Sequence, residues 1–385
     1  MGPQHTTKGG KISNKPMALY DKWLFFSVVL LTGIGSLMVA SSSIVISEKH
    51  FNLPFYYFIK QTIYIGVGIV CALLIIRRPM KQWFNLSKPL LLVSMILLIL
   101  VLIPGLGRSV NGSSRWLGFA GIALQVSEFA KLAIILYIAS FLDRHYEEVQ
   151  SRLSGFFKPL LVLGLMVALL LKEPDFGAAV VIILTVLGML FLAGVKLWQF
   201  TLLLGAAFCS IASLAVSSPY RVARLTSFMD PWANQFDGGY QLTQSLIAFG
   251  RGGLTGVGLG ESVQKLFYLP EAHTDFLLAV LGEELGLVGL LIVFSLYLIV
   301  FVRGMMIGRF AEKNGQRFSA FVAYGLSLWL SCQAMINIGV NIGLLPTKGL
   351  TLPFMSSGGS SIVVCFAAMA LLLRIDYEDR WQIYS

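Results

Sequence analysis

Ten long apolar runs dominate this sequence, and they restrict the folds that the chain can adopt. A helix needs about 20 mostly apolar residues to cross a bilayer. The chain is 56% hydrophobic and only 12% charged, which excludes an ordinary soluble domain. We therefore predict an all-α integral membrane protein with ten transmembrane helices, at residues 23–46, 54–76, 86–103, 127–142, 157–171, 176–195, 197–217, 276–302, 318–345 and 357–373.

The positive residues predict how these helices are oriented. Most of the 29 lysines and arginines fall in the N-terminal tail and the even-numbered connections, and cytoplasmic loops are enriched in both residues. Both termini are therefore predicted to be cytoplasmic. The predicted organisation is a flexible cytoplasmic tail at 1–17, a membrane domain at 18–376 with a large periplasmic loop at 218–274 between helices seven and eight, and a cytoplasmic tail at 377–385.

Neither the net charge of +10 nor the cysteines indicate another class of protein. The basic residues are spread along the whole chain, which indicates topology signals and contacts to anionic ligands rather than nucleic acid. The cysteines lie singly within apolar runs, so neither a zinc site nor a disulfide framework is predicted. They are Cys71, Cys209, Cys332 and Cys365.

Residues 265–286, KLFYLPEAHTDFLLAVLGEELG, place ionisable side chains at the edge of an apolar run. Glu271, His273 and Asp275 fall within five positions, and Glu283 and Glu284 follow inside the predicted eighth helix. A charge near the bilayer centre costs about 2.5–3.5 kcal/mol on insertion scales, so carboxylates of this kind indicate function.

Asp275 has two interpretations. It could stabilise the first turn of the eighth helix through the helix dipole, a purely structural role. It could also be a general base, because Thr274 can cap the helix in its place and the aromatics Phe267 and Tyr268 would raise its pKa. The second interpretation is favoured.

Basic residues near the predicted outer helix ends would suit a protein that handles an anionic group from the outer face. They are Arg108, Arg115, Lys131, Lys172, Arg221, Arg224 and Arg251. For Arg108 and Arg115, snorkelling to lipid headgroups is an equally good interpretation. Glu128 and Lys131 lie three residues apart on one helix face, so they form either a structural ion pair or the wall of a polar cavity.

Three further segments on the predicted outer side have functional and structural interpretations. Asp175 either caps the sixth helix or lines a cavity. The stretch 250–260, GRGGLTGVGLG, follows no strand and is no nucleotide motif; close backbone packing is favoured over a phosphate-binding nest. Residues 353–361, PFMSSGGSS, offer hydroxyls and N–H groups for an anion at the start of helix ten, with Ser357 and Gly358 at their centre.

An amphipathic helix that lies in the membrane interface is predicted at 240–249. Its apolar face would hold Leu242, Leu246, Ile247 and Phe249, opposite Gln241, Gln244 and Ser245.

Several of these motifs together resemble the SEDS family of bacterial cell-wall glycosyltransferases. They are YLPEAHTDF followed by LGEELG, the loop SSRW, the pair Glu128 and Lys131, the turn EPDFG and the terminal PFMSSGGSS. The resemblance covers nearly the whole chain, in order. VQKLFYLPEAHTDF and FGRGG are more similar to the cell-division members of the family than to the elongation members.

The resemblance implies a ten-helix peptidoglycan polymerase at the outer face of the bacterial inner membrane, at the division septum. Its substrate would be lipid II, the undecaprenyl-diphosphate-linked disaccharide pentapeptide. Its partners would be a cognate class b penicillin-binding protein and other membrane proteins of division. The essential acidic residue of the family falls on Asp275, and the implied substrate-binding residues are Lys131, Glu128, Arg115, Arg221, Asp175, Lys60, Gln125, Ser357 and Gly358.

Two positions depart from the family pattern. Val126 replaces the usual proline, and Lys60 replaces the usual arginine. Neither change removes a reactive group, but a lysine cannot make the bidentate phosphate contact of an arginine.

The residues suit this chemistry on their own terms. A diphosphate leaves as an anion, so sugar transfer from such a donor needs one carboxylate base and cations, without an acid. A divalent cation, Mg²⁺ or Mn²⁺, is compatible as counter-ion, but no compact ligand set predicts one. The alternatives are a carrier such as a lipid II flippase, which would use the intramembrane charges but should show internal repeats, and a division scaffold.

Overall fold

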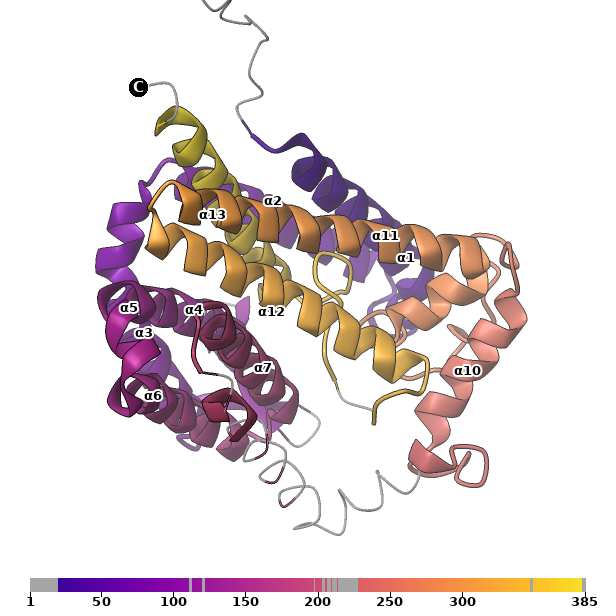
Figure 1. The fold of residues 1–385 in the computed structure, drawn as a ribbon. Coiled ribbons are helices and arrows are strands. Elements are labelled where there is room, and N and C mark those ends of the chain that lie inside the picture. The colour runs from indigo at the N-terminus through magenta and orange to yellow at the C-terminus, as the bar shows by residue number, and fades with distance from the viewer. Residues whose placement is uncertain are drawn as a thin grey trace, which may run out of the picture.

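The computed structural model describes residues 20–110, 113–119, 122–196, 198–202, 205, 209, 213, 228–346 and 349–382. This part is built almost wholly of helices (Figure 1). They are α1 (Lys22–Phe51), α2 (Tyr56–Ile76), α3 (Met80–Val101), α4 (Val126–Arg144), α5 (Tyr146–Ser151), α6 (Leu153–Lys172), α7 (Phe176–Leu192), α10 (Tyr240–Gly252), α11 (Leu277–Lys313), α12 (Arg317–Asn341) and α13 (Ser360–Gln382).

The predicted apolar runs match these helices. Every run except 197–217, most of which lies outside the described residues, falls on one of them. Within the described ranges, seven helices are long and apolar enough to cross a membrane: α1, α2, α3, α6, α11, α12 and α13. α7 is apolar but shorter, and α4 carries the charges of Glu128 and Lys131 in its first turns.

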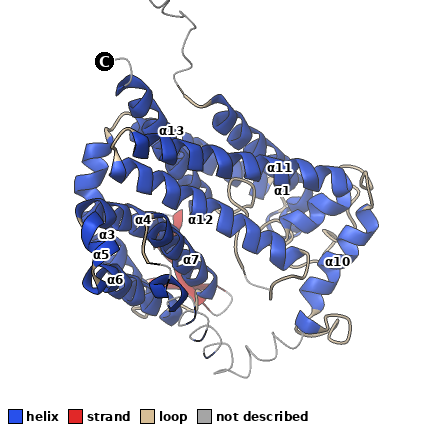
Figure 2. Cartoon of the chain, in the orientation of Figure 1, coloured by secondary structure: helices blue, strands red, loops and turns tan. Residues whose placement is uncertain are grey.

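The all-α prediction misses a small sheet. Strands β1 (Gly107–Val110), β2 (Ser113–Phe119) and β3 (Ile122–Gln125) pair antiparallel in the order β1-β2-β3, where a loop was expected (Figure 2, red). Trp116 of β2 pairs with Gln125, the residue directly before α4. The sheet therefore fixes the entry into the helix that carries Glu128 and Lys131.

The two described chain ends lie together. Tyr20 and Tyr377 stack with ring centroids 5.7 Å apart, and Asn314, just after α11, donates a hydrogen bond to Asp379 of α13 (3.2 Å). In Figure 1 the start of α1 and the end of α13 share one end of the molecule. We call this the terminal end; it agrees with termini on one side of a membrane, and which side stays a prediction.

Several helix ends meet at the opposite end, which we call the site end. The Asn341 amide at the end of α12 donates to the carbonyl of Asp275, which precedes α11 (3.0 Å). The backbone N–H of Gln125 before α4 donates to the Ser360 hydroxyl at the start of α13 (3.0 Å). The polar residues singled out in the sequence gather here because these helices begin or end here.

Helix α11 is interrupted at Gly286, whose φ of 63° and ψ of −162° are not helical. The glycine-rich segment 253–258 supplies the backbone hydrogen bonds that the break leaves open. Leu287 and Val288 donate to the carbonyls of Gly253 and Leu254 (3.0 and 3.1 Å). A Cβ atom at Gly256 would lie 2.1 Å from the carbonyl oxygen of Glu284. The predicted close backbone packing of the glycine run is thus confirmed.

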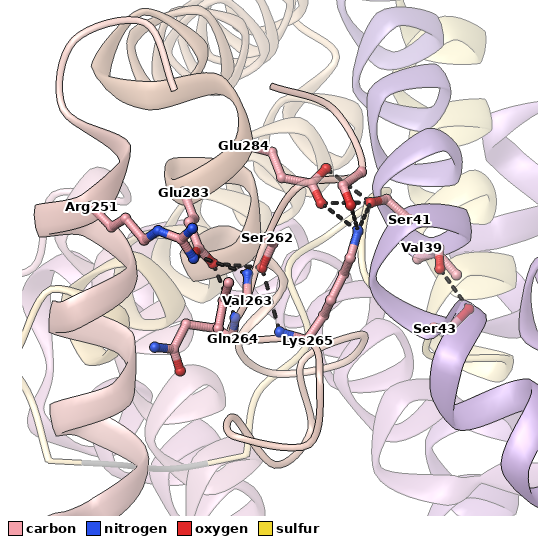
Figure 3. Close-up of polar contacts among 11 residues, drawn as sticks. Val39, Ser41, Ser43, Arg251, Ser262, Val263, Gln264, Lys265, Glu283 and Glu284 are labelled. Carbon is pink, nitrogen blue, oxygen red and sulfur yellow. Dashed lines mark hydrogen bonds and ion pairs between the residues drawn. The ribbon is translucent and has the colours of Figure 1, made fainter. Parts of the chain in front are cut away.

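Glu283 and Glu284, next to this break, bind the same segment through their side chains (Figure 3). Glu283 accepts hydrogen bonds from Arg251 (2.9 Å), from the Ser262 hydroxyl (2.5 Å) and from backbone N–H groups of Val263 and Gln264. These contacts attach the segment that leads to Asp275 to α11.

Glu284 accepts from the buried ammonium of Lys265 (2.9 Å) and from the Ser41 hydroxyl of α1 (2.6 Å). Lys265 also donates to the carbonyl of Gly260 (2.6 Å). Both carboxylates are fully buried and hydrogen-bonded, so they are structural groups that join α1, α11 and the segment 250–265.

Replacing Gly256 by Ala is expected to destabilise the protein by about 1–3 kcal/mol, because its φ of +82° and the 2.1 Å approach to Glu284 both exclude a Cβ atom. Gly250 is the matched control, since no atom lies within 4 Å of its Cβ position. Unfolding of the two variants in detergent would be compared. A Gly256→Ala protein as stable as the Gly250→Ala protein would contradict the close packing.

The amphipathic helix predicted at 240–249 is present as α10, but its buried face differs from the prediction. Leu242, Thr243, Ser245, Ala248 and Gly252 are buried, whereas Ile247 is 37% exposed. The reason is that α10 packs closely on α11, and small residues allow this approach. The Ser245 hydroxyl donates to the Asn341 carbonyl (2.8 Å).

The predicted topology can be tested with single cysteines at Phe236, which is 86% exposed, and at exposed Lys313 near the terminal end. In a background without the native cysteines, an impermeant thiol reagent added outside should label position 236 only. A variant labelled at position 313 from outside would contradict cytoplasmic termini.

Candidate functional site

Asp275 is not a helix cap in the structure. Phe276 occupies the N-cap position of α11 and makes no side-chain cap bond. The prediction that Thr274 caps this helix is also wrong, because its hydroxyl donates to the carboxylate (2.6 Å) and carbonyl of Glu271. Removing the capping role leaves the Asp275 carboxylate free for another function.

The surroundings of Asp275 favour its neutral form. Its pKa is raised from the ordinary range to about 7, first by burial and next by the Glu271 carboxylate, while Arg115 lowers it and Asp175 raises it. Part of the residue nevertheless stays exposed. Phe267 and Tyr268, expected to provide the apolar setting, are themselves 47% and 51% exposed, so the raised pKa comes from other groups.

His273 adds no positive charge beside this carboxylate. The ring is buried against Tyr57 of α2, with centroids 4.4 Å apart, and burial lowers the pKa of the imidazole although Glu271 raises it. The nearby cation is therefore Arg115.

Arg115 of β2 connects the sheet to the turn before α7. Its guanidinium donates to the Pro174 carbonyl (2.6 Å) and lies 3.8 Å from the Asp175 carboxylate. The capping role predicted for Asp175 is confirmed: its Oδ1 accepts from the Ala178 N–H (3.2 Å) as the N-cap of α7. Capping and the contact to Arg115 occur together on the same oxygen, Oδ1, whereas Oδ2 has no hydrogen-bond partner within the described residues.

Glu173, two residues earlier, belongs to the same group and was not selected from the sequence. It is fully buried, and neither of its carboxylate oxygens has a hydrogen-bond partner within the described residues. Burial and the nearby Asp175 raise the pKa of this carboxyl to about 8, against a lowering by Arg115. The raised pKa favours the neutral form of Glu173 near pH 7, so the charged group that lies against Arg115 is the Asp175 carboxylate.

Glu128 and Lys131 form a buried ion pair inside the bundle. The ammonium donates to Glu128 (2.8 Å) and to the Gln333 side-chain oxygen of α12 (2.6 Å), and lies 5.2 Å from the centroid of the Trp329 ring. Lys131 is 1% exposed. An ammonium has three N–H donors, and two of them have hydrogen-bond partners among the described residues.

The segment 349–361 connects this pair to Asp275. Gln333 donates to the Thr351 carbonyl (2.9 Å), and the Thr351 hydroxyl is 3.0 Å from that of Ser361. The Ser357 N–H donates to the His273 carbonyl (3.1 Å). One hydrogen-bonded network therefore holds both groups of charges.

The structure gives less support to the remaining predicted substrate-binding residues. The Ser357 N–H is already bound, and Gly358 packs on Ser361 and Thr351, so little of the proposed anion site at α13 remains free. The Gln125 side chain donates to the Ser127 hydroxyl (3.2 Å). Lys60 is exposed on α2, and Arg221 lies outside the described residues.

No group of three or more His, Cys, Asp or Glu side chains that could hold a metal ion occurs within the described ranges. The carboxylates around Arg115 fit a cationic partner poorly, because Glu173 is held neutral by burial. The geometry instead supplies a partly exposed carboxylate of raised pKa, Asp275, and an arginine with access to solvent, Arg115.

Comparison with known proteins identifies the family of this chain. The family model FTSW_RODA_SPOVE, described as "Cell cycle protein", matches residues 22–381. The chain belongs to this family. Its members include a protein of Legionella pneumophila, 55% identical over 382 residues (99% of this chain and 97% of the relative), and one of Coxiella burnetii, 57% identical over 359 residues (93% and 96%). Both carry the name "Probable peptidoglycan glycosyltransferase FtsW".

Solved structures of family members share the fold. One, described under "Structural coordination of polymerization and crosslinking by a peptidoglycan synthase complex", superposes with a TM-score of 0.78 at 28% identity, over 94% of this chain and 99% of the other. The rod shape determining protein RodA of Thermus thermophilus superposes with a TM-score of 0.70 at 27% identity, over 94% and 98%. The resemblance drawn from the motifs is thereby confirmed.

Proposed function

We propose that this chain is a peptidoglycan glycosyltransferase that polymerises lipid II during septal cell-wall synthesis, with Asp275 as general base. The observation that carries the proposal is a partly exposed carboxylate whose pKa is about 7, within electrostatic reach of Arg115. A base works best when its pKa lies near the working pH. Relatives that are more than half identical bear the name of this activity.

The reaction needs one proton transfer and one charge to be stabilised. Asp275 takes the proton from the acceptor sugar hydroxyl, whose oxygen forms a bond to the anomeric carbon of the donor. The bond from that carbon to the diphosphate breaks, and the diphosphate leaves with the electron pair. Arg115 is the cation best placed to hold it, because its side chain is 25% exposed and its charge acts on Asp275.

Lys131 acts at a distance in this proposal. Its ammonium is buried and bound to Glu128 and Gln333, so it contributes positive potential and holds the network in place. Glu128, Asp175, Lys60, Gln125, Ser357, Gly358 and Arg221 remain proposed substrate-binding residues on the strength of the family resemblance.

The proposed setting is the bacterial inner membrane at the septum, with the site end facing the periplasm. The proposed partner is a class b penicillin-binding protein that cross-links the new strands. Support comes from the seven membrane-compatible helices in the described ranges and from the relative whose structure is described as a peptidoglycan synthase complex.

A lipid carrier is the competing function, and the buried charges speak against it. Glu283 and Glu284, which a carrier would use as an intramembrane relay, are both engaged in fixed hydrogen bonds to the segment 260–265 and to Ser41 (Figure 3). Their position is explained by the break at Gly286 without any transport step.

The deciding experiment incubates the purified full-length chain with fluorescent lipid II, first alone and then with its penicillin-binding partner. Glycan chains on a gel are expected, and they should be absent when Asp275→Asn protein replaces the native one. Translocation of lipid II across liposomes without any chains would show a carrier. If neither polymerisation nor translocation is detected with the partner present, the chain acts as a scaffold.

The polymerisation rate is expected to rise with pH through a midpoint near 7, because Asp275 must be ionised to accept a proton and its pKa is about 7. Below the midpoint the rate should fall about tenfold per pH unit, as one ionisation requires. Initial rates between about pH 5.5 and 8.5 would show this. A flat profile over that range would contradict the assignment of the base.

A further inference from the structure

Helix α12 carries three amide side chains on one face. Gln333, Asn337 and Asn341 are spaced four residues apart, which keeps them nearly in line along a helix of about 3.6 residues per turn. All three are buried, at 0%, 2% and 0% exposure. Buried amides in an apolar helix need partners, and these find them on two parts of the site, one at Lys131 and one at Asp275.

Gln333 binds the Lys131 side of the site. Its side-chain oxygen accepts from the Lys131 ammonium (2.6 Å) and from the Trp329 indole (2.9 Å), and its NH₂ group donates to the Thr351 carbonyl (2.9 Å). This one amide therefore fixes the lysine and the segment 349–361 at the same time.

Asn337 and Asn341 bind the Asp275 side. Both donate to the backbone carbonyl of Asp275, at 2.9 and 3.0 Å. The carbonyl lies outside the α11 hydrogen-bond pattern, because the Ala279 N–H bonds to the Phe276 carbonyl instead (3.0 Å). The two side-chain amides therefore bind the Asp275 carbonyl in place of a backbone N–H group of α11.

Asn337 also acts on the carboxylate of Asp275 through a second contact. It donates to the Leu350 carbonyl (2.6 Å), and the neighbouring Gly349 lies directly against the carboxylate, since a Cβ there would be 2.8 Å from Oδ2. Backbone and side chain of Asp275 are thus both held from α12.

We infer that the amide face of α12 is the positioning element of the enzyme: Asn337 and Asn341 set the Asp275 carboxylate, and Gln333 ties that position to Lys131. This inference rests on the proposed role of Asp275 as base. The three amides are positioning residues, since they touch the base and the network rather than the reacting atoms.

A purely structural role would predict a different result. Amides between membrane helices can simply satisfy one another and add a little stability. In that case their loss would lower the amount of folded protein, while each folded molecule would keep its turnover and its pH profile. The rate per folded molecule and the pH midpoint therefore decide between the two roles.

The test uses Asn337→Leu, Asn341→Leu and the double variant, as full-length protein with lipid II. Each single change leaves one donor on the Asp275 carbonyl and should lower kcat about 3- to 10-fold. The double change should lower it more than about 30-fold, because a misplacement of about 1 Å can cost 100-fold. Retention of labelled lipid II, measured separately, should change little.

The pH midpoint gives the independent readout. A carboxylate released from its position gains water, so the midpoint should move below that of the native enzyme, with Glu271, Arg115 and Asp175 still acting on it. Ser327→Ala is the matched control on the same helix, because in the part of the chain that the structure describes the buried Ser327 hydroxyl bonds only to the Ala323 carbonyl of its own helix (2.7 Å). It should keep kcat within about twofold, as a change away from the site does.

A double variant that folds, turns over normally and keeps the native midpoint would overturn the inference. If the double variant does not fold, unchanged kcat in both single variants would overturn it equally. The proposed base is tested apart from this: an active Asp275→Asn protein would remove the base itself. An inactive one together with fully active Asn variants would remove only the positioning role.

Discussion

Replacing Asp275 by Asn is expected to lower the rate of lipid II polymerisation by about 100-fold or more, the range that loss of a general base allows. Asn keeps the size of the side chain but cannot accept the proton. Folding should be unaffected, because the carboxylate caps no helix and the contacts of α12 go to the Asp275 backbone. Rates would be measured on protein that retains labelled lipid II.

Asp237→Asn is the control for this change, since it removes the same charge from an exposed position in the predicted outer loop that precedes Asp275. It should leave the rate unchanged. The small rate that remains in the Asp275→Asn protein should also lose its rise near pH 7. Near-normal turnover would mean that the catalytic carboxylate lies elsewhere, with Glu271 and Asp175 the next residues to test.

The helices could be predicted from the sequence because each apolar run must bury its backbone polar groups in a helix wherever it meets lipid. The interruptions and the ends of these helices could not be predicted in this way. Gly286 sits in an apolar run, and nothing local marks it as a break. The break is stable only because the segment 253–258, some 30 residues earlier, pairs with the exposed backbone.

The small sheet was missed although a signal for it exists. The letters between β1 and β2 are Asn111 and Gly112, a dipeptide that strongly favours tight hairpins. The aromatic and basic residues near it, Arg115 and Trp116, are equally typical of a loop at the membrane surface. A test for hairpins in loops between apolar runs would have predicted it.

The charged residues of the site could be predicted from the sequence, but the residues that hold them in position could not. Asp275 was favoured as base because Thr274 could cap the helix in its place and because aromatics and cations lie nearby in the sequence. The more general argument, that carboxylates in an apolar segment indicate function, applied equally to Glu283 and Glu284, which the structure assigns to packing. Only tertiary contacts separate the two cases. The amides of α12 carried a readable signal, three polar residues at a spacing of four in an apolar helix, but their partners lie far away in the sequence.

Replacing Lys131 by Met is expected to destabilise the protein by about 3–5 kcal/mol, because it leaves the Glu128 carboxylate buried without its cation. Glu128 is 3% exposed, and its Oε2 already has no partner among the described residues. Met keeps most of the volume of lysine, so packing changes little. Unfolding in detergent would measure the loss, and polymerisation would fall with it through both misfolding and lost potential.

A second change separates these two causes. In the double variant Glu128→Gln, Lys131→Met no charge is buried, so most of the stability should return. Activity should stay low if the ammonium provides positive potential for the departing diphosphate, and Lys131→Arg should fold yet polymerise poorly, since a planar guanidinium cannot satisfy Glu128 and Gln333 in the same geometry. Recovery of both stability and activity in the double variant would show that Glu128 and Lys131 are a structural ion pair and that Arg115 supplies the charge that catalysis needs.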